Sequence, residues 1–241
     1  IDFEQVSFRY PNASHNALEN VSFHIRKGEH IAIVGENGSG KSTVMKLLCG
    51  IYTCHDGCIR IGQKDIKSCN ISSLYPKFTA VFQNYGRYAM TVDENIQLAE
   101  TADPQSLAAV KDLQGLECLQ ELPGSEILSR EFGGTDLSGG QWQRIAIARA
   151  KYRDGDIYLL DEPTAAIDPN EEKRLYDLFQ TITDGKTAVI VTHRMSAARL
   201  ADRIMVFKAG RLCGFGTHGE LQEHCREYRR LWSSQADIYI K

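Results

Sequence analysis

The feature that most constrains this chain is a nine-residue stretch with the spacing G-x-x-x-x-G-K-[ST], the pattern of a phosphate-binding loop. An apolar segment, 31–34, precedes the stretch and suits a buried parallel strand. After it, Val44, Leu47 and Leu48 repeat at helical spacing, and Gly50 offers a stop. The stretch therefore has the strand, turn and helix that a phosphate site requires. Its residues are Gly35, Glu36, Asn37, Gly38, Ser39, Gly40, Lys41, Ser42 and Thr43.

The chemistry of this loop follows from its residue types. Glycines let the backbone fold tightly around an anion, with the N–H groups pointing inward. A helix that begins near Lys41 adds the positive end of its dipole. Lys41 can then bridge the β- and γ-phosphates, and the hydroxyl of Ser42 is placed to bind Mg²⁺. The loop thus predicts a nucleoside triphosphate with Mg²⁺.

Composition and charge exclude little. A chain of 241 residues can form one large domain or two lobes, and 42% hydrophobic with 24% charged residues is ordinary for a globular protein. The net charge of −3 comes without a basic stripe, so nothing indicates a nucleic-acid partner. Seven cysteines show no paired framework, which favours a reducing compartment. The stretch from Cys54 to Cys58 lacks a second ligand pair and is better explained as a turn before a strand than as a zinc site.

The chain also lacks the marks of membrane insertion. No apolar run approaches the roughly 20 residues that span a bilayer, and no signal peptide is visible. The sequence begins at Ile1, without an initiator methionine and already inside a strand-like pattern. We therefore expect a fragment of a longer polypeptide, and the missing membrane span then says nothing about the parent protein.

Hydrophobic patterning predicts an α/β fold. Alternation in 1–10 and 21–25 suggests two half-exposed antiparallel strands before the loop, and 57–62 adds strand material after it. Strands that alternate with helical stretches such as 171–182 indicate a parallel sheet covered by helices. Its later strands are expected at 81–83, a short buried strand that ends in the polar Gln83, and at the apolar runs 157–160, 188–191 and 204–207.

The region between Gln83 and Asp156 has a different hydrophobic pattern from the rest of the chain. From Val92 to about Tyr152 its pattern is helical, and Asp103 before a proline marks the start of one helix. We expect this insertion to form a second lobe.

Two acidic residues follow one predicted strand directly. The run 157–160 leads into Asp161 and Glu162, and ligands of open parallel sheets bind outside the carboxyl ends of the strands. Asp161 is the natural ligand on the metal side, directly or through water. Glu162 can orient and deprotonate an attacking water as a general base. Carboxylates that merely cap a turn are the alternative.

A second candidate anion site precedes the helix expected from Gln143 to Tyr152. Ser138 suits an N-cap, and the glycines after it expose backbone N–H groups at a helix N-terminus. Of the two turns, only the first carries a lysine and is accompanied by an acid pair at a strand end. One solution is that the two turns hold the same nucleotide from different chains. The residues of the second turn are Ser138, Gly139, Gly140 and Gln141.

Together these motifs resemble the nucleotide-binding domain of an ATP-binding cassette (ABC) transporter over essentially the whole chain. The loop 35–43 matches Walker A, 157–162 matches Walker B with its glutamate, and 137–141 is the LSGGQ signature of the family. The resemblance implies a phosphate-loop NTPase core with a parallel sheet, an N-terminal antiparallel β subdomain and an α-helical signature subdomain. Residues 1–83 and 154–241 would form the core with the β subdomain, and 84–153 the helical one.

The resemblance also implies roles for single residues. Gln83 matches the Q-loop glutamine that touches Mg²⁺ and the attacking water, and His193 matches the switch histidine at the γ-phosphate. Tyr10 matches the aromatic residue that stacks on adenine; from its place at a strand end alone, a surface tyrosine is equally plausible. Asp168 lies in the matching D-loop, where Ala165 replaces a frequent small hydroxyl residue.

At the level of the whole protein, the family implies ATP and Mg²⁺ as cofactors and a second cassette as partner. It also implies transmembrane domains as partners and a location of the cassette at the cytoplasmic face of the cell membrane, as part of a membrane protein. The C-terminal run from Gly216 is similar to exporter-type cassettes, and the surroundings of Trp142 are similar to peptide and bacteriocin exporters. The segment 130–134 departs from the exporter pattern Gly-Glu-x-Gly, which leaves the detail of coupling open. Tyr85, Arg87 and Tyr88 are candidates to receive a membrane domain, since such residues anchor interfaces.

Two other classes remain as alternatives. A soluble ABC ATPase of translation or DNA repair usually carries two cassettes or long coiled-coil or basic insertions, which this chain does not show. A phosphate-loop kinase would need an acceptor-binding lid where the signature helix lies.

Overall fold

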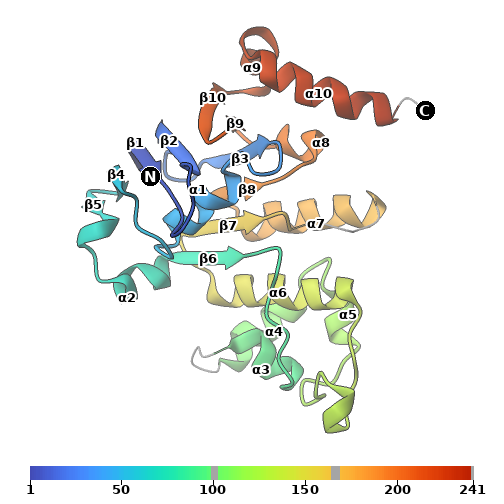
Figure 1. Ribbon diagram of the computed structural model, residues 1–241. Helices are drawn as coiled ribbons and strands as arrows, with labels where there is room; N and C mark the ends of the chain where they lie inside the picture. The colour runs from blue at the N-terminus through green and yellow to red at the C-terminus, as the bar shows by residue number, and fades with distance from the viewer. Residues whose placement is uncertain (99–102, 164–168, 240–241) are drawn as a thin grey trace.

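The computed structural model describes residues 1–98, 103–163 and 169–239 (Figure 1). In this part of the chain six strands form a sheet in the order β10-β9-β3-β8-β7-β6, and its pairs are parallel except β9 with β10. This is the α/β arrangement that the alternating pattern predicted. The strands are β3 (His30–Gly35), β6 (Phe78–Val81), β7 (Ile157–Asp161), β8 (Thr187–Val191), β9 (Arg203–Lys208) and β10 (Arg211–Gly216).

A second, antiparallel sheet has the order β2-β1-β4-β5, as expected for the first strands. Phe3 and Phe23 stack across it with ring centroids 4.3 Å apart, and both are buried. Its apolar face and one face of the main sheet enclose helix α1 (Lys41–Leu48) in a single hydrophobic cluster. The phosphate-loop helix is therefore held between two sheets. The strands are β1 (Asp2–Phe8), β2 (Leu18–His24), β4 (Asp56–Ile61) and β5 (Lys64–Asp65).

The opposite face of the main sheet is covered by later helices. Tyr158 and Leu160 of β7 pack there against α6 and α7, while Ala32 and Val34 of β3 pack against the C-terminal helices. The strict alternation of the two faces along β3 and β7 is the period of two that a sheet covered on both sides requires. The helices are α6 (Gly139–Arg153), α7 (Pro169–Ile182), α8 (Met195–Ala198), α9 (His218–His224) and α10 (Arg226–Tyr239).

Residues 92–98 and 103–153 form a helical region beside β6, at the bottom of Figure 1. The predicted start at Asp103 is correct, because its carboxylate accepts a hydrogen bond from the N–H of Gln105 and Pro104 occupies the first turn. The region is not continuously helical, since between α5 and α6 only a short 3₁₀ turn, Arg130–Phe132, is helical. Its α-helices before α6 are α3 (Val92–Gln97), α4 (Pro104–Lys111) and α5 (Glu117–Gln120). A further short helix, α2 (Ile71–Leu74), precedes β6.

Two expectations about strands need correction. The strand expected at 81–83 lies at Phe78–Val81, because pairing with β7 ends where Val81 meets Leu160. Gln83 therefore follows the strand instead of ending it. The antiparallel edge strand β10 was not expected, since its sequence RLCGFG carries two glycines and no regular alternation.

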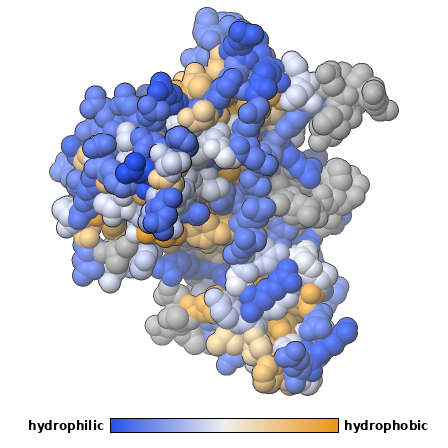
Figure 2. All heavy atoms as spheres, viewed as in Figure 1, coloured by the Kyte–Doolittle hydropathy of each residue, from blue (hydrophilic) through white to orange (hydrophobic). Residues whose placement is uncertain are grey.

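No helix in the described ranges is both long and apolar enough to cross a membrane. On the face shown in Figure 2 most residues are hydrophilic, and apolar residues gather in small groups, several of them over the lower, helical part. Among the described residues, three exposed large apolar side chains lie in or beside that part: Tyr88 (45%), Met90 (44%) and Phe132 (65%).

Candidate functional site

The carboxyl ends of four neighbouring strands meet at one cleft. Gly35 ends β3 and Asp161 ends β7, while Gln83 and His193 each follow two residues after β6 and β8. The cleft has a volume of about 540 Å³ and is the kind of site that open parallel sheets form beyond their strand ends. It is lined by Tyr10, Ala17, Asn37, Gly38, Gly40, Lys41, Ser42, Thr43, Gln83, Glu162 and His193.

Two glycines of the loop have no room for a side chain. A Cβ on Gly35 would lie 2.3 Å from the carbonyl oxygen of Phe207, and one on Gly40 would lie 2.8 Å from that of Ala17. Gly40 also has φ +105°, a conformation that other residues rarely adopt. These contacts seat the loop against β9 and the segment before β2, so the start of α1 is held at the cleft.

Lys41 is buried, and its ammonium donates hydrogen bonds of 2.9 Å to the carbonyl oxygens of Gly35 and Glu36. Burial lowers the pKa of Lys41, and the nearby carboxylates of Glu162 and Asp161 act against that shift. The loop thus holds a cation in a partly dry site, where its attraction for a phosphate is stronger than in water.

Two of the residues expected to bind the metal, Ser42 and Asp161, contact each other. The hydroxyl of Ser42 donates to Asp161 Oδ1 at 3.2 Å, which joins the end of β7 to the start of α1. Burial raises the pKa of Asp161, the hydrogen bond from Ser42 lowers it, and the charge of Glu162 raises it further. A divalent cation would relieve this crowding of negative charge.

The site fits Mg²⁺ and a phosphate chain in its donor set. A hydroxyl and a carboxylate are ligands that Mg²⁺ accepts, usually together with water and phosphate oxygens. Ser39 supplies a second observation, because its buried Oγ is without a hydrogen-bond partner in the described structure. A bound phosphate oxygen close to the loop would satisfy such a group.

Glu162 and His193 both line the cleft and contact each other directly, with His193 Nε2 2.5 Å from Glu162 Oε1. Glu162 has φ +50°, an uncommon value for a side chain of its size, and its N–H donates to the carbonyl of Val191 at 3.0 Å. Backbone strain of this kind concentrates at functional sites, where the surroundings hold it. The strand ends thus bring together the acid and the histidine that the sequence pointed to separately.

Tyr10 lies at the rim of the same cleft, after β1. Its hydroxyl is 3.1 Å from Thr43 Oγ1, and its ring contacts Phe8 and Tyr52 edge-on. The ammonium of Lys46 lies 5.3 Å from the ring centroid. Neither Lys46 nor Ala17 was predicted from the sequence, because a lysine on a helix and an alanine in a loop carry no motif.

The second candidate turn is separate from this cleft. Ser138 caps α6: its Oγ accepts the N–H of Gln141, and Gln141 Oε1 accepts the N–H of Ser138. Both Ser138 and Gly139 are exposed, and none of the four residues of this turn lines the cleft. The hydroxyl of Tyr85 donates to the carbonyl of Gly139 at 2.9 Å. The N-terminus of α6 is therefore presented outward, away from its own chain's phosphate loop. Asp168 lies outside the described residues.

Known proteins are similar to this chain in sequence and in fold. The family described as "ABC transporter" matches residues 18–165. The subtilin transport ATP-binding protein SpaT of Bacillus subtilis is 39% identical over 97% of this chain and 39% of its own length. The nisin transport ATP-binding protein NisT of Lactococcus lactis subsp. lactis is 36% identical over 95% of this chain and 40% of its own.

A solved structure of a bacterial Atm1-family ABC exporter with ATP bound superposes with a TM-score of 0.88 at 30% identity. The match covers 98% of this chain and 42% of that one. It confirms the predicted fold class. The chain spans about two fifths of the length of the proteins it matches.

Proposed function

This chain belongs to the ABC transporter family and is an ATP-binding, ATP-hydrolysing domain of it, and we propose that it powers export across a membrane through transmembrane domains of the same protein. The observation that carries the proposal is the cleft that gathers Lys41, Glu162 and His193 at neighbouring strand ends. The relatives reported above are named for transport, which favours this function over a soluble ATPase of translation or DNA repair.

Within the cleft we assign each residue a task. Walker A, 35–43, holds the phosphates, with Lys41 on the β- and γ-phosphates, and Tyr10 stacks on the adenine. Glu162 accepts a proton from the attacking water, while Gln83 and His193 orient the water and the γ-phosphate. Ser42, Gln83 and Asp161 would hold Mg²⁺, which when bound neutralises charge on the phosphates.

The signature turn completes the site only from a second chain. Ser138, Gly139, Gly140 and Gln141 form an exposed helix N-terminus, which is suited to bind a phosphate but lies outside the cleft of its own chain. We infer that two cassettes close head to tail, so that each ATP lies between the phosphate loop of one and the signature turn of the other. Asp168 would contribute at the same interface. The proposed helical subdomain is 84–153, and the core with the β subdomain is 1–83 and 154–241.

A crosslinking experiment tests this arrangement. One copy of the full-length protein carries Ser138→Cys and the other Asn37→Cys, both with Glu162→Gln to slow hydrolysis. With ATP and Mg²⁺ a short thiol crosslinker should join the two copies, because closure brings the signature turn over the neighbour's phosphate loop. Ser106→Cys, another exposed serine of the helical region, replaces Ser138→Cys as the control for random reaction. Equal crosslinking with and without ATP, or with the control, contradicts the arrangement.

The transmembrane partner is proposed to dock beside the loop after Gln83. A groove of about 320 Å³ runs between β6, this loop and α6. Arg149 holds the loop in place: its guanidinium donates to the carbonyls of Gly86 and Asn95 and lies 5.1 Å from the Tyr88 ring centroid. Tyr85 is engaged with the signature turn, which leaves Arg87 and Tyr88 as the exposed members of the trio.

We expect Arg87→Ala with Tyr88→Ala to lower ATP hydrolysis by the full-length protein in lipid vesicles about 5–10-fold, since interface anchors commonly contribute more than 1 kcal/mol. ATP binding should stay within about twofold, because neither side chain lines the nucleotide cleft. Tyr75→Ala is a matched control, as Tyr75 is 47% and Tyr88 45% exposed. Full hydrolysis in the double variant removes this surface from the proposal. The cargo we propose is a peptide, lipid or drug, bound by membrane helices.

A further inference from the structure

The C-terminal helix α10 contacts two parts of the nucleotide site, the phosphate loop and the loop of His193, although no motif lies in it. Tyr228 anchors the helix as a fully buried side chain in the hydrophobic cluster that also contains Ala32 and Val34 of β3, and Leu231 and Trp232 pack against this cluster. β3 is the strand that leads into the phosphate loop. The helix is thus held in the same hydrophobic cluster as β3, and Figure 1 shows it at the top, on the side of α8.

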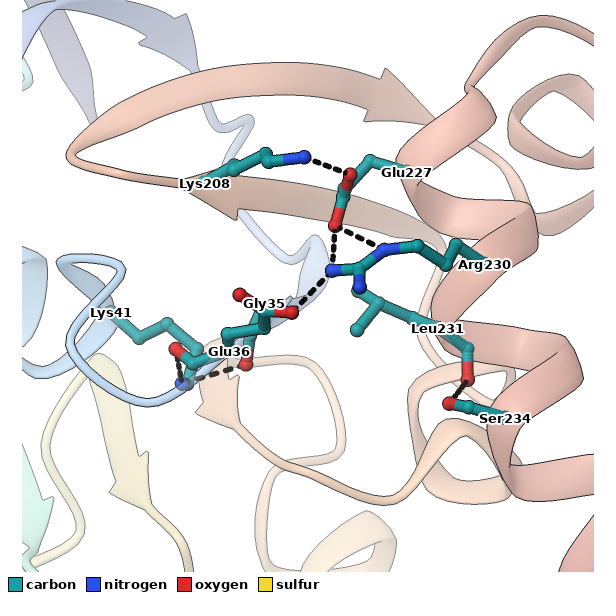
Figure 3. Close-up of polar contacts among 8 residues, drawn as sticks. All are labelled: Gly35, Glu36, Lys41, Lys208, Glu227, Arg230, Leu231 and Ser234. Carbon is teal, nitrogen blue, oxygen red and sulfur yellow. Dashed lines mark hydrogen bonds and ion pairs between the residues drawn. The ribbon is translucent and has the colours of Figure 1, made fainter.

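The first contact reaches the phosphate loop. The guanidinium of Arg230 pairs with the carboxylates of Glu36 and Glu227, and Glu227 in turn accepts from Lys208 at 2.7 Å (Figure 3). The carbonyl oxygen of the same Glu36 accepts a hydrogen bond from Lys41. One residue of the loop therefore receives α10 through its side chain and the phosphate lysine through its backbone.

The second contact reaches the loop of the switch histidine. The side-chain amide of Gln235 donates to the carbonyl of His193, and its oxygen accepts the N–H of Met195 at 2.9 Å. These two backbone groups flank Arg194, at the turn between β8 and α8. Since the His193 ring lies 2.5 Å from Glu162, the amide of Gln235 is two contacts away from the proposed general base.

We propose that α10 sets the distance between the phosphate loop and the histidine loop, with Gln235 as a positioning residue for His193 and Arg230 as one for Glu36 and Lys41. The inference rests on the proposed ATP hydrolysis and extends it to residues outside the family motifs. Substitutions of the two residues should change different kinetic parameters, kcat for Gln235 and KM for Arg230. Gln235 supports the residues that act on the attacking water and the γ-phosphate, whereas Arg230 supports the loop that binds the phosphates.

Steady-state ATP hydrolysis by the full-length protein separates these effects. Gln235→Ala should lower kcat about 5–20-fold with KM within twofold, and Gln235→Glu should do the same, because a carboxylate of similar size cannot donate to the His193 carbonyl. Arg230→Ala should raise KM about 2–5-fold with kcat within twofold, since the pair is exposed, and Arg230→Lys should restore it by keeping the charge. Arg229→Ala is the matched control: its guanidinium contacts the carbonyls of Gln222 and Glu223 on α9.

Hydrogen exchange without nucleotide gives a readout that does not depend on hydrolysis. The amide of Met195 should exchange about tenfold faster in Gln235→Ala than in Arg229→Ala, because its hydrogen-bond acceptor is lost. If kcat, KM and exchange of the Gln235 variants all stay within twofold of the control, the proposal is overturned. Absence of ATP hydrolysis in the unmodified protein would instead contradict the proposed function, and exchange at Met195 would still decide whether α10 holds the histidine loop.

Discussion

Glu162→Gln is expected to lower the rate of ATP hydrolysis by about 10²–10⁴, a rise of about 3–5 kcal/mol in the activation barrier, while ATP binding is kept. The amide has the size of the carboxylate and preserves the backbone, which the N–H of Glu162 fixes on the Val191 carbonyl. It cannot accept a proton from the attacking water. Because hydrolysis reopens the proposed dimer, the variant should also accumulate an ATP-bound dimer.

The measurement is single-turnover hydrolysis with full-length protein, together with size analysis in ATP and Mg²⁺. Glu223→Gln serves as the matched control, since the side chain of Glu223 is 75% exposed and lies on α9 near His224. Near-normal turnover of Glu162→Gln would remove Glu162 from the role of base. Slow turnover without a dimer would keep that role and contradict the link between hydrolysis and opening.

Lys41→Ala is expected to weaken ATP binding by about 10²-fold or more. Of the three donors of the ammonium, two contact loop carbonyls in the described part of the chain, which leaves a third for a phosphate oxygen. A hydrogen bond between charged groups contributes about 1.5–3 kcal/mol, and attraction for the remaining phosphate charge adds to it. The variant also removes one of the cations near the carboxylates of Asp161 and Glu162, so repulsion of the phosphates increases.

Calorimetric titration of ATP into the full-length protein measures the loss. Lys64→Ala is the control, because Lys64 is an exposed lysine on β5. Unchanged ATP affinity in Lys41→Ala would contradict the assignment of 35–43 as the phosphate loop. Loss of affinity in both variants would point to a general electrostatic effect of removing a lysine.

Local patterns were sufficient for a large part of the fold. The strand before the loop, the helix after it and the N-caps at Asp103 and Ser138 each depend on a few neighbouring residues, so spacing and residue type predict them. The end of β6 was placed two residues late, because Phe82 continues the apolar pattern past Val81 for a reason other than strand pairing. Phe82 lies beside the groove next to α6 instead.

The sequence by itself determined which chemistry this chain can carry: a lysine in a glycine loop, an acid pair after a strand and a capped helix with a free N-terminus are local facts. Only the tertiary structure decided which of them share a site. The strand order places the ends of β3, β8, β7 and β6 side by side, although Gly35 at the end of β3 and Val191 at the end of β8 are 156 positions apart in the chain. The same order leaves Ser138 outside the cleft and places α10 against the two loops beside it. Such contacts arise from the packing of sheet faces, which local spacing does not encode.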